Sequence, residues 1–262
     1  MPSRILRMSA AFFRLPTRCA VLLVLGLLVL GLLPGCSAPC GDALICRWVE
    51  ASEERPLTVV AYGTSLTASG GWPYALSLDL ERFFPGRSRI EITAESARAS
   101  DWGLAQFEAR VLAHAPDVLF VEFAVNDAFV PYDISVATSR ANLETMLDRL
   151  DTDYPSCAVV LIVTNHVVGE GAAIRPNLAD YYAEVRRIAG ERGLLLVDEE
   201  AAWRRLRERA PAVFDVLVPD GLHPTYAGND RVTRPLLWDA LHDVETDLDA
   251  LVAAVIAATP VP

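Results

Sequence analysis

The sequence predicts an α/β fold in which helices cover both faces of a five-stranded parallel sheet. Short runs of aliphatic and β-branched residues have the length of buried strands. Segments of about ten or more residues with helical periodicity separate them, as in a parallel sheet. The chain has 262 residues, of which 52% are hydrophobic. This length and composition suffice for one sizeable α/β core and are short for two full domains.

The expected strands occupy residues 57–61, 89–94, 118–123, 158–164 and 194–197. The expected helices occupy residues 72–84, 102–113, 139–150, 178–192, 199–209, 226–240 and 244–257. Pro73 stands in the first turn of the first helix, where a proline is tolerated, and Pro85-Gly86 ends that helix. Five strands on this plan suit a flavodoxin-like, doubly wound sheet and therefore a three-layer sandwich.

Residues 1–35 are expected to be a signal peptide of the lipoprotein type. Four arginines precede an uncharged run from Cys19 to Gly35, and its apolar part is shorter than the ~20 residues needed to cross a bilayer. The run ends in Leu33-Pro34-Gly35-Cys36, which resembles a bacterial lipobox, in which the cysteine becomes lipidated. Cleavage by an ordinary signal peptidase and an uncleaved membrane anchor are the alternative interpretations.

After such a signal, residues 36–56 form an anchor segment or linker and residues 57–262 form the folded domain. The protein is then expected to be exported to the bacterial cell envelope, as a membrane-anchored lipoprotein that faces the periplasm or the exterior. An oxidising compartment also permits a disulfide between Cys40 and Cys46. A zinc site is disfavoured there, because no histidine is near and Cys-x5-Cys is not a common zinc spacing.

The charged residues exclude several classes of function. All 23 basic residues are arginine, and the absence of lysine excludes a Walker-type phosphate loop and Schiff-base chemistry. The formal net charge of −11 argues against nucleic acid as a partner, because phosphate binding requires clustered cations. An acidic protein is also not drawn to anionic lipid head groups, so the expected membrane contact is the lipid anchor alone. The sequence indicates no particular oligomeric state.

Ser65 is the candidate nucleophile. The apolar run from Leu57 to Ala61 reads as a buried strand that breaks at Gly63 and leads into small, hydroxylated residues. In an open parallel sheet, ligands bind outside the carboxyl ends of the strands. A serine at the end of such a strand therefore stands where a substrate would bind.

His223 is the candidate base. A catalytic serine needs a neutral imidazole, and the imidazole needs an acceptor that orients it. Of the four histidines, only His223 lies in a turn-rich loop with a carboxylate three residues upstream, at Asp220. His166 follows a strand without a neighbouring carboxylate, and surface positions fit His114 and His242.

Three blocks of sequence combine these residues in one order. They are Gly63-Thr64-Ser65-Leu66-Thr67, Ala124-Val125-Asn126-Asp127 and Asp220-Gly221-Leu222-His223-Pro224. Together they resemble the SGNH, or GDSL-type, hydrolase family, whose members have a flavodoxin-like sheet and hydrolyse esters. Each block alone is weak, but their joint order and spacing are specific. The α/β-hydrolase elbow Gly-x-Ser-x-Gly is excluded, because Thr67 occupies the place of its second glycine.

The resemblance implies a serine esterase mechanism that requires neither a metal nor a cofactor. Ser65 attacks the ester carbonyl and forms an acyl-enzyme, while His223 accepts its proton and Asp220 orients the imidazole. The oxyanion hole is expected to consist of the backbone N–H groups of Ser65 and Ala97 and the side-chain amide of Asn126.

Three positions depart from the family pattern. Thr64 replaces an aspartate that is not a member of the catalytic set, and Ala124 replaces a glycine. Ala97 stands where the family has a functional glycine. Alanine retains the N–H, provided that the backbone there does not require a positive φ. Ser100 is a second candidate in this block.

Glu122, Trp72 and Trp102 lie close to these blocks in the sequence. A buried carboxylate is usually paired, so we expect Glu122 to meet an arginine or to lie at a sheet edge. Core packing is the expected role of both tryptophans, with a wall of the substrate pocket as the alternative.

The substrate is expected to be a small-molecule or glycan ester. Export favours O-acyl or O-acetyl esters outside the cytoplasm, such as those of an acetylated carbohydrate. A lipase, lysophospholipase or thioesterase of the same fold is the alternative enzyme. A non-catalytic surface lipoprotein that acts as a binding module is the alternative from another class, but a binding module does not need this set of catalytic residues.

Overall fold

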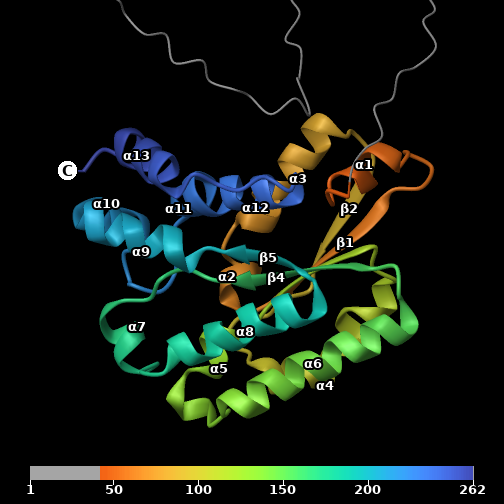
Figure 1. Ribbon diagram of the computed structural model, residues 1–262, viewed down its shortest axis with the longest axis horizontal. Helices are drawn as coiled ribbons and strands as arrows, with labels where there is room; N and C mark the ends of the chain where they lie inside the picture. The colour runs from red at the N-terminus through yellow and green to blue at the C-terminus, as the bar shows by residue number, and fades with distance from the viewer. Residues whose placement is uncertain (1–41, 262) are drawn as a thin grey trace, which may run out of the picture. The chain divides into compact units, whose positions relative to one another are not determined.

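The computed structural model describes residues 42–261 of the chain. The predicted signal peptide, Cys36 and Cys40 lie outside these residues, so the predictions made for them stay predictions. Five parallel strands form one sheet in the order β2-β1-β3-β4-β5 (Figure 1). The strands are β1 Leu57–Gly63, β2 Ser88–Ile92, β3 Val118–Glu122, β4 Ala158–Val163 and β5 Leu195–Asp198. This is the flavodoxin-like order, and it confirms the predicted fold class.

Successive residues of the strands face two separate cores. In β1, Val59 and Ala61 point to one core, and Val60 and Tyr62 point to the other. The first face is covered by α1 Cys46–Glu50, α3 Trp72–Phe83, α9 Glu200–Arg209, α10 Pro211–Leu217, α12 Arg234–Leu241 and α13 Leu248–Ala258. The second face is covered by α4 Ser100–Arg110, α6 Val136–Asp153 and α8 Leu178–Arg192 (Figure 1).

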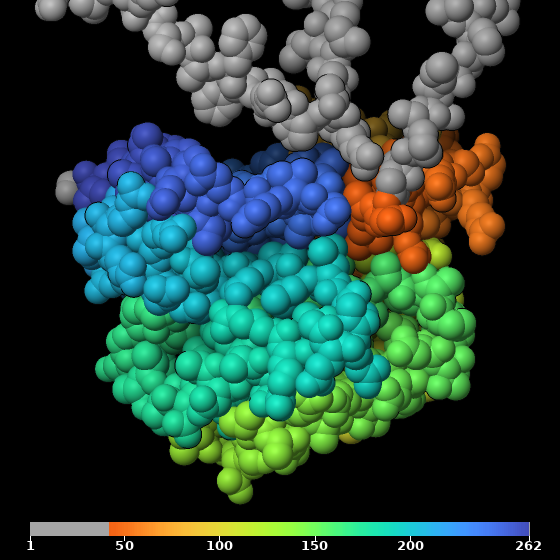
Figure 2. All heavy atoms as spheres, in the orientation of Figure 1, coloured from red at the N-terminus to blue at the C-terminus, as the bar shows by residue number. Residues whose placement is uncertain are grey.

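The two helical layers lie on opposite sides of the domain. Figure 2 shows the last helices, in blue, and α6, in green, at opposite sides of the view, with the teal segments of α8 and β5 between them. The strands are therefore buried on both faces, which explains why β1, β3 and β4 read as nearly continuous apolar runs.

Short helices gather where the strands end. They are α2 Ser65–Ala68 after β1, α5 Ala124–Asp127 after β3 and α7 Gly169–Ala173 after β4. Parallel strands place their carboxyl ends at one edge of the sheet. Because Gly63 is the register partner of Glu122, the segments that follow β1 and β3 begin at the same level of that edge.

Several element boundaries differ from the predicted ones. The helical pattern over residues 226–240 is divided into α11 Tyr226–Gly228, a π-helical turn η3 Asn229–Thr233 and α12. The last helix begins at Leu248 and not at residue 244. Its start is set by the Asp247 carboxylate, which accepts hydrogen bonds from the N–H groups of Asp249 and Ala250 at 3.0 Å each. The short α1, α7 and α10 and the 3-10 turns η1 Leu112–His114 and η2 Val130–Tyr132 were not predicted.

The cysteines bear on the predicted disulfide. Cys46 is disulfide-bonded, but Cys40 is not among the described residues, and the pairing between them stays a prediction. Cys157 is a free thiol, and burial raises its pKa to about 12, so it is an unreactive part of the fold. No helix within residues 42–261 combines the length and the apolarity required to cross a membrane.

Candidate active site

The turn after β1 presents Ser65 at the carboxyl edge of the sheet. Thr64 is the N-cap residue of α2, and its hydroxyl accepts a hydrogen bond from the Leu66 N–H at 3.2 Å. Ser65 is the first residue of α2 and is partly exposed, whereas Thr64 and Leu66 are buried. The candidate nucleophile is therefore the accessible residue of an otherwise buried turn.

Ser65, His223 and Asp220 form one continuous hydrogen-bonded chain. The Ser65 Oγ lies 3.0 Å from His223 Nε2, and His223 Nδ1 lies 2.7 Å from Asp220 Oδ2. The other carboxylate oxygen, Asp220 Oδ1, accepts the backbone N–H groups of Leu222 at 2.9 Å and of His223 at 2.7 Å. The fold thus brings Ser65 to an aspartate and a histidine that lie more than 150 positions later in the sequence.

The surroundings of Asp220 keep its carboxylate ionised. Partial burial acts to raise its pKa, but the hydrogen bonds from His223 and from the Leu222 N–H outweigh burial and hold the pKa below its usual value. An ionised carboxylate only accepts hydrogen bonds, so the imidazole carries its hydrogen on Nδ1. The other ring nitrogen, Nε2, is then the acceptor for the Ser65 hydroxyl. This arrangement can remove the serine proton during attack on a carbonyl.

Contacts with the segment after β4, two from the backbone of Val168 and one from the side chain of Asn165, hold the histidine loop in place. Gly221 has a φ of +75°, and a Cβ at this position would lie 2.6 Å from the Val168 carbonyl oxygen. The Val168 N–H donates to the Gly221 oxygen at 2.8 Å, and the Asn165 amide donates to the Leu222 oxygen at 2.9 Å. Only glycine fits this close approach in a left-handed conformation.

Asn126 lies in α5, at the end of β3, and is buried. One of its amide hydrogens is donated to the Arg98 carbonyl oxygen at 2.8 Å, which leaves the second amide hydrogen as a donor. The backbone N–H groups of Ser65 and Ala97 have no acceptor among the described residues. These three groups are the ones that the sequence assigns to the oxyanion hole.

Ala97 does not meet the condition set for it from the sequence. Its φ is +57°, in the left-handed region that favours glycine. The alanine therefore retains the N–H but in a strained backbone. The Tyr132 hydroxyl donates to the Ala97 carbonyl at 3.0 Å and helps to hold this conformation. The second candidate, Ser100, is buried and is engaged elsewhere, as described next.

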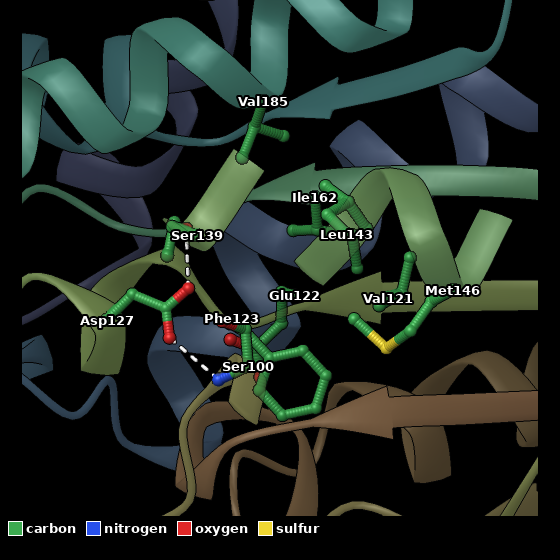
Figure 3. Close-up of a pocket in the computed structure, with 11 residues that line it drawn as sticks. Ser100, Val121, Glu122, Phe123, Asp127, Ser139, Leu143, Met146, Ile162 and Val185 are labelled. Atoms are coloured by element: carbon green, nitrogen blue, oxygen red, sulfur yellow. Dashed lines mark hydrogen bonds between the residues drawn. The ribbon is translucent and has the colours of Figure 1, made fainter. Parts of the chain in front are cut away.

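A buried polar network surrounds Asp127, the residue that follows Asn126 in the sequence (Figure 3). The Asp127 carboxylate accepts hydrogen bonds from the Ser100 N–H at 2.7 Å and the Ser139 hydroxyl at 2.5 Å. The Asn142 amide donates to the Ser100 hydroxyl at 2.9 Å. Ser100, Asp127 and Ser139 line a cavity of about 20 Å³, and burial raises the pKa of Asp127 to about 6. The network joins α5 to the starts of α4 and α6.

Glu122 contradicts the expectation that it would meet an arginine. Its buried carboxyl accepts the Thr64 N–H at 2.6 Å, the Thr64 hydroxyl at 3.0 Å and the Thr67 hydroxyl at 2.8 Å. Among residues 42–261 no basic side chain pairs with it. Burial raises its pKa to about 8, and these hydrogen bonds act in the opposite direction. The prediction of an arginine partner was wrong because hydroxyl and backbone donors satisfy a buried carboxyl as an arginine would. The alternative, a place at a sheet edge, was wrong as well, because Glu122 belongs to β3, the central strand of the sheet.

The remaining candidates take no part in this chain of hydrogen bonds. His166 Nδ1 is 3.3 Å from Glu200 Oε1, so a carboxylate from a distant part of the sequence accompanies it. Trp72 is buried and packs on Phe120, with ring centroids 5.4 Å apart, which confirms its role in the core. Trp102 packs on Tyr62, with ring centroids 5.8 Å apart.

Two buried polar residues near the site were not predicted. The Arg175 Nε donates to the Val125 carbonyl at 2.7 Å, next to Asn126. The Asn229 amide donates to the Gly70 carbonyl, at the end of the nucleophile loop. Both contacts join positions far apart in the sequence, and no local pattern distinguishes these residues. Within residues 42–261 no group of three or more His, Cys, Asp or Glu side chains is arranged to hold a metal ion.

Comparisons with solved structures agree with this architecture. An acetylxylan esterase from Geobacillus stearothermophilus shares 19% identity and a TM-score of 0.60, over 71% of this chain and 94% of that chain. A putative GDSL-like lipase from Parabacteroides merdae shares 18% identity and a TM-score of 0.61, over 71% and 95% of the two chains. LAE5, an alpha/beta hydrolase enzyme from the metagenome of Lake Arreo, Spain, shares 22% identity and a TM-score of 0.61, over 72% and 97%.

The sequence comparisons identify the family. No curated protein matches the chain. The model of the GDSL-like lipase/acylhydrolase family matches residues 59–231, which include most of β1, the three sequence blocks and most of the domain. The chain therefore belongs to the GDSL-like lipase/acylhydrolase family and is a hydrolase of ester bonds.

Proposed function

We propose that the protein is an exported serine esterase that cleaves carboxylic esters through an acyl-enzyme on Ser65. The observation that carries this proposal is the hydrogen-bonded chain from Ser65 through His223 to Asp220. The Geobacillus acetylxylan esterase has been solved as catalytic mutants in which a serine, an aspartate or a histidine is replaced by alanine. The same three residue types form the chain here.

The reaction begins when Ser65 Oγ attacks the ester carbonyl carbon and transfers its proton to His223 Nε2. Asp220 stabilises the imidazolium that forms and holds its orientation. The negative charge on the carbonyl oxygen is stabilised by the N–H groups of Ser65 and Ala97 and by the free amide hydrogen of Asn126. His223 then protonates the departing alcohol. Water, deprotonated by the same imidazole, releases the acid and restores Ser65.

The proposed substrate is an O-acyl or O-acetyl ester carried by a carbohydrate. The His223 and Asp220 side chains are 44% and 54% exposed, so a bulky alcohol such as a sugar can approach the base. The acetylxylan esterases among the similar structures support an acetylated glycan. Lipase, lysophospholipase and thioesterase activities of the same fold are the competing outcomes.

A substrate screen tests this proposal. We expect the purified protein to hydrolyse p-nitrophenyl acetate faster than p-nitrophenyl palmitate and to release acetate from acetylated xylan, and we expect Ser65→Ala to abolish both activities. Preference for palmitate would identify the enzyme as a lipase, and preference for an acyl thioester would identify it as a thioesterase, in place of a carbohydrate esterase. A folded protein without any Ser65-dependent hydrolysis would favour the binding module.

The proposed location is the bacterial cell envelope, with the membrane reached through a lipid on Cys36. The arginine-flanked apolar run and the sequence Leu33-Pro34-Gly35-Cys36 support it. Mass spectrometry of the mature N-terminus tests it. A diacylated or triacylated Cys36 is expected, and an unmodified residue at that position would rule the anchor out.

A further inference from the structure

The carboxyl group of Glu122 lies directly beneath the turn that carries Ser65. Three of its hydrogen bonds come from that turn: the Thr64 N–H, the Thr64 hydroxyl and the Thr67 hydroxyl, at distances between 2.6 and 3.0 Å. Thr64 and Thr67 stand on either side of Ser65 in the sequence. One buried carboxyl group is therefore hydrogen-bonded to the turn both before and after the serine.

The same carboxyl group also orients the cap of α2. The Thr64 hydroxyl donates its hydrogen to Glu122, so its lone pairs stay available for the Leu66 N–H, which lies 3.2 Å from the oxygen. An N-cap hydroxyl accepts such a bond only when its own hydrogen points elsewhere. Glu122 thus determines the direction in which helix α2, with Ser65 at its first position, leaves the strand.

The carboxyl group of Glu122 has room beside β1 because the residue opposite it is a glycine, which has no side chain. Glu122 is the register partner of Gly63, and a Cβ on Gly63 would lie 2.3 Å from Glu122 Oε1. Glu122 is also the last residue of β3, four positions before Asn126. The strand that ends at Glu122 therefore continues into the turn that presents the oxyanion donor.

We propose that Glu122 is a positioning residue for the esterase reaction, which ties the Thr64–Thr67 turn to the end of β3. Through this link, Ser65 Oγ stays aligned with His223 Nε2 and at a constant distance from the Asn126 amide. Glu122 touches neither the substrate nor the reacting atoms. The proposal rests on the role of Ser65 as the nucleophile.

Glu199 provides a matched control. It is a second buried glutamate, located just after β5, but its partners are the Thr233 hydroxyl at 2.8 Å and the Trp203 indole N–H at 3.4 Å. Neither partner belongs to the turn that carries Ser65. Replacement of Glu199 therefore perturbs a buried carboxyl group of the same kind without touching that turn.

The test compares five variants of the full-length protein: Glu122→Met, Glu122→Gln, Glu199→Met, Thr67→Val and Thr67→Ser. The rate of acylation is measured as the p-nitrophenolate burst from p-nitrophenyl acetate, together with KM and the melting temperature. Methionine has a similar length but no acceptor for the turn. Glutamine keeps a carbonyl oxygen in the position of Oε1 and can keep the three hydrogen bonds.

We expect Glu122→Met to slow acylation by a factor on the order of ten or more, with KM changed by less than about twofold, because misplacement of the serine affects the reacting geometry and not ester binding. Glu122→Gln and Glu199→Met should acylate at nearly the wild-type rate. Thr67→Val should lie between Glu122→Met and wild type, and Thr67→Ser should restore the rate.

An undiminished acylation rate in folded Glu122→Met would overturn the proposal. So would an equal loss in Glu122→Gln or in Glu199→Met, because the effect would then come from charge or from general destabilisation. If Glu122→Met does not fold, the threonine pair decides, and a wild-type rate in Thr67→Val counts against the proposal. Failure of the proposed function is distinct from these outcomes, since it appears as a wild-type protein that does not hydrolyse the ester or as hydrolysis that persists in Ser65→Ala.

Discussion

At Ala97 the backbone adopts a φ of +57°, where the β-carbon crowds the neighbouring carbonyl oxygen. Such a conformation costs a non-glycine residue on the order of 1–2 kcal/mol. The site tolerates this cost because a hydrogen bond from Tyr132 and the adjoining α4 hold the loop in place. The loop that contains Ala97 thus stores strain at the position where the GDSL-type family has glycine.

Replacement of Ala97 by glycine should stabilise the protein. Relief of the strain exceeds the entropy that glycine adds to the unfolded chain, so we expect the free energy of unfolding to rise by about 0.5–1 kcal/mol. Urea unfolding measures this change. Ala99→Gly is the control, because Ala99 is buried at a φ of −118° and its replacement should destabilise. A loss of stability in Ala97→Gly equal to that in Ala99→Gly would contradict the assignment of strain.

Removal of the Asn126 side chain should impair the rate of the reaction far more than the binding of the ester. Loss of one oxyanion donor costs about 10²–10³ in rate, so Asn126→Ala should retain residual activity. Steady-state kinetics with p-nitrophenyl acetate measures the effect as a fall in kcat at nearly constant KM. A kcat within a few-fold of wild type would show that Asn126 only supports the Arg98 carbonyl.

Among the elements, the strands and the long helices could be predicted from the sequence. Burial within the sheet and against it produces the apolar runs of β1, β3 and β4 and the periodic pattern of α8. These patterns can be recognised from the local order of residues along the chain. The division of residues 226–240 could not be predicted in this way. The π-helical turn places Asn229 against Gly70, and that contact joins residues 159 positions apart.

The same distinction holds for the candidate site. Ser65, Asp220 and His223 carry sequence signals, because each stands in a short block with turn residues around it. The surroundings of Glu122 carry none, since its donors come from residues 55 and 58 positions away. The positive φ of Ala97 is set by the loop as a whole, and alanine itself gives no sign of it.

The first turn of α13 offers a prediction at the scale of one element. Asp247 caps the helix through two backbone N–H groups, and the helix packs on α9 and η3. Asp247→Ala should lower the free energy of unfolding by about 1 kcal/mol without a change in kcat. Thermal unfolding measures the change, with the exposed Glu245→Ala as the control. Equal stability of the two variants would mean that the cap does not hold the helix.

At the scale of the whole molecule, buried carboxyl groups give the fold a dependence on pH. Burial raises the pKa of Glu122 to about 8, of Glu199 to about 7 and of Asp127 to about 6. The native state then holds protons that the unfolded chain has released. This contribution to stability is complete below the pKa values of the unfolded chain, near 4, and is lost as pH rises through the native values.

We therefore expect the free energy of unfolding to fall between pH 6 and pH 8, by up to about 1.4 kcal/mol per pH unit for each group that is neutral in the native state and charged in the unfolded chain. Urea unfolding across this range measures the slope. In Glu199→Gln the slope should be smaller, because one of these groups no longer titrates. Stability that rises with pH, or an unchanged slope in the variant, would contradict these pKa shifts.

The most direct measurement of the central claim is the reaction of the folded protein with a fluorophosphonate, followed by mass spectrometry of the digested chain. An activated serine forms a stable adduct with this reagent, whereas ordinary surface serines do not. We expect one adduct, on the peptide that contains Ser65. Ser65→Ala should remove it, and His223→Ala should greatly slow its formation. A folded protein that forms no adduct, or forms it on another serine, would contradict the role of Ser65 as the nucleophile.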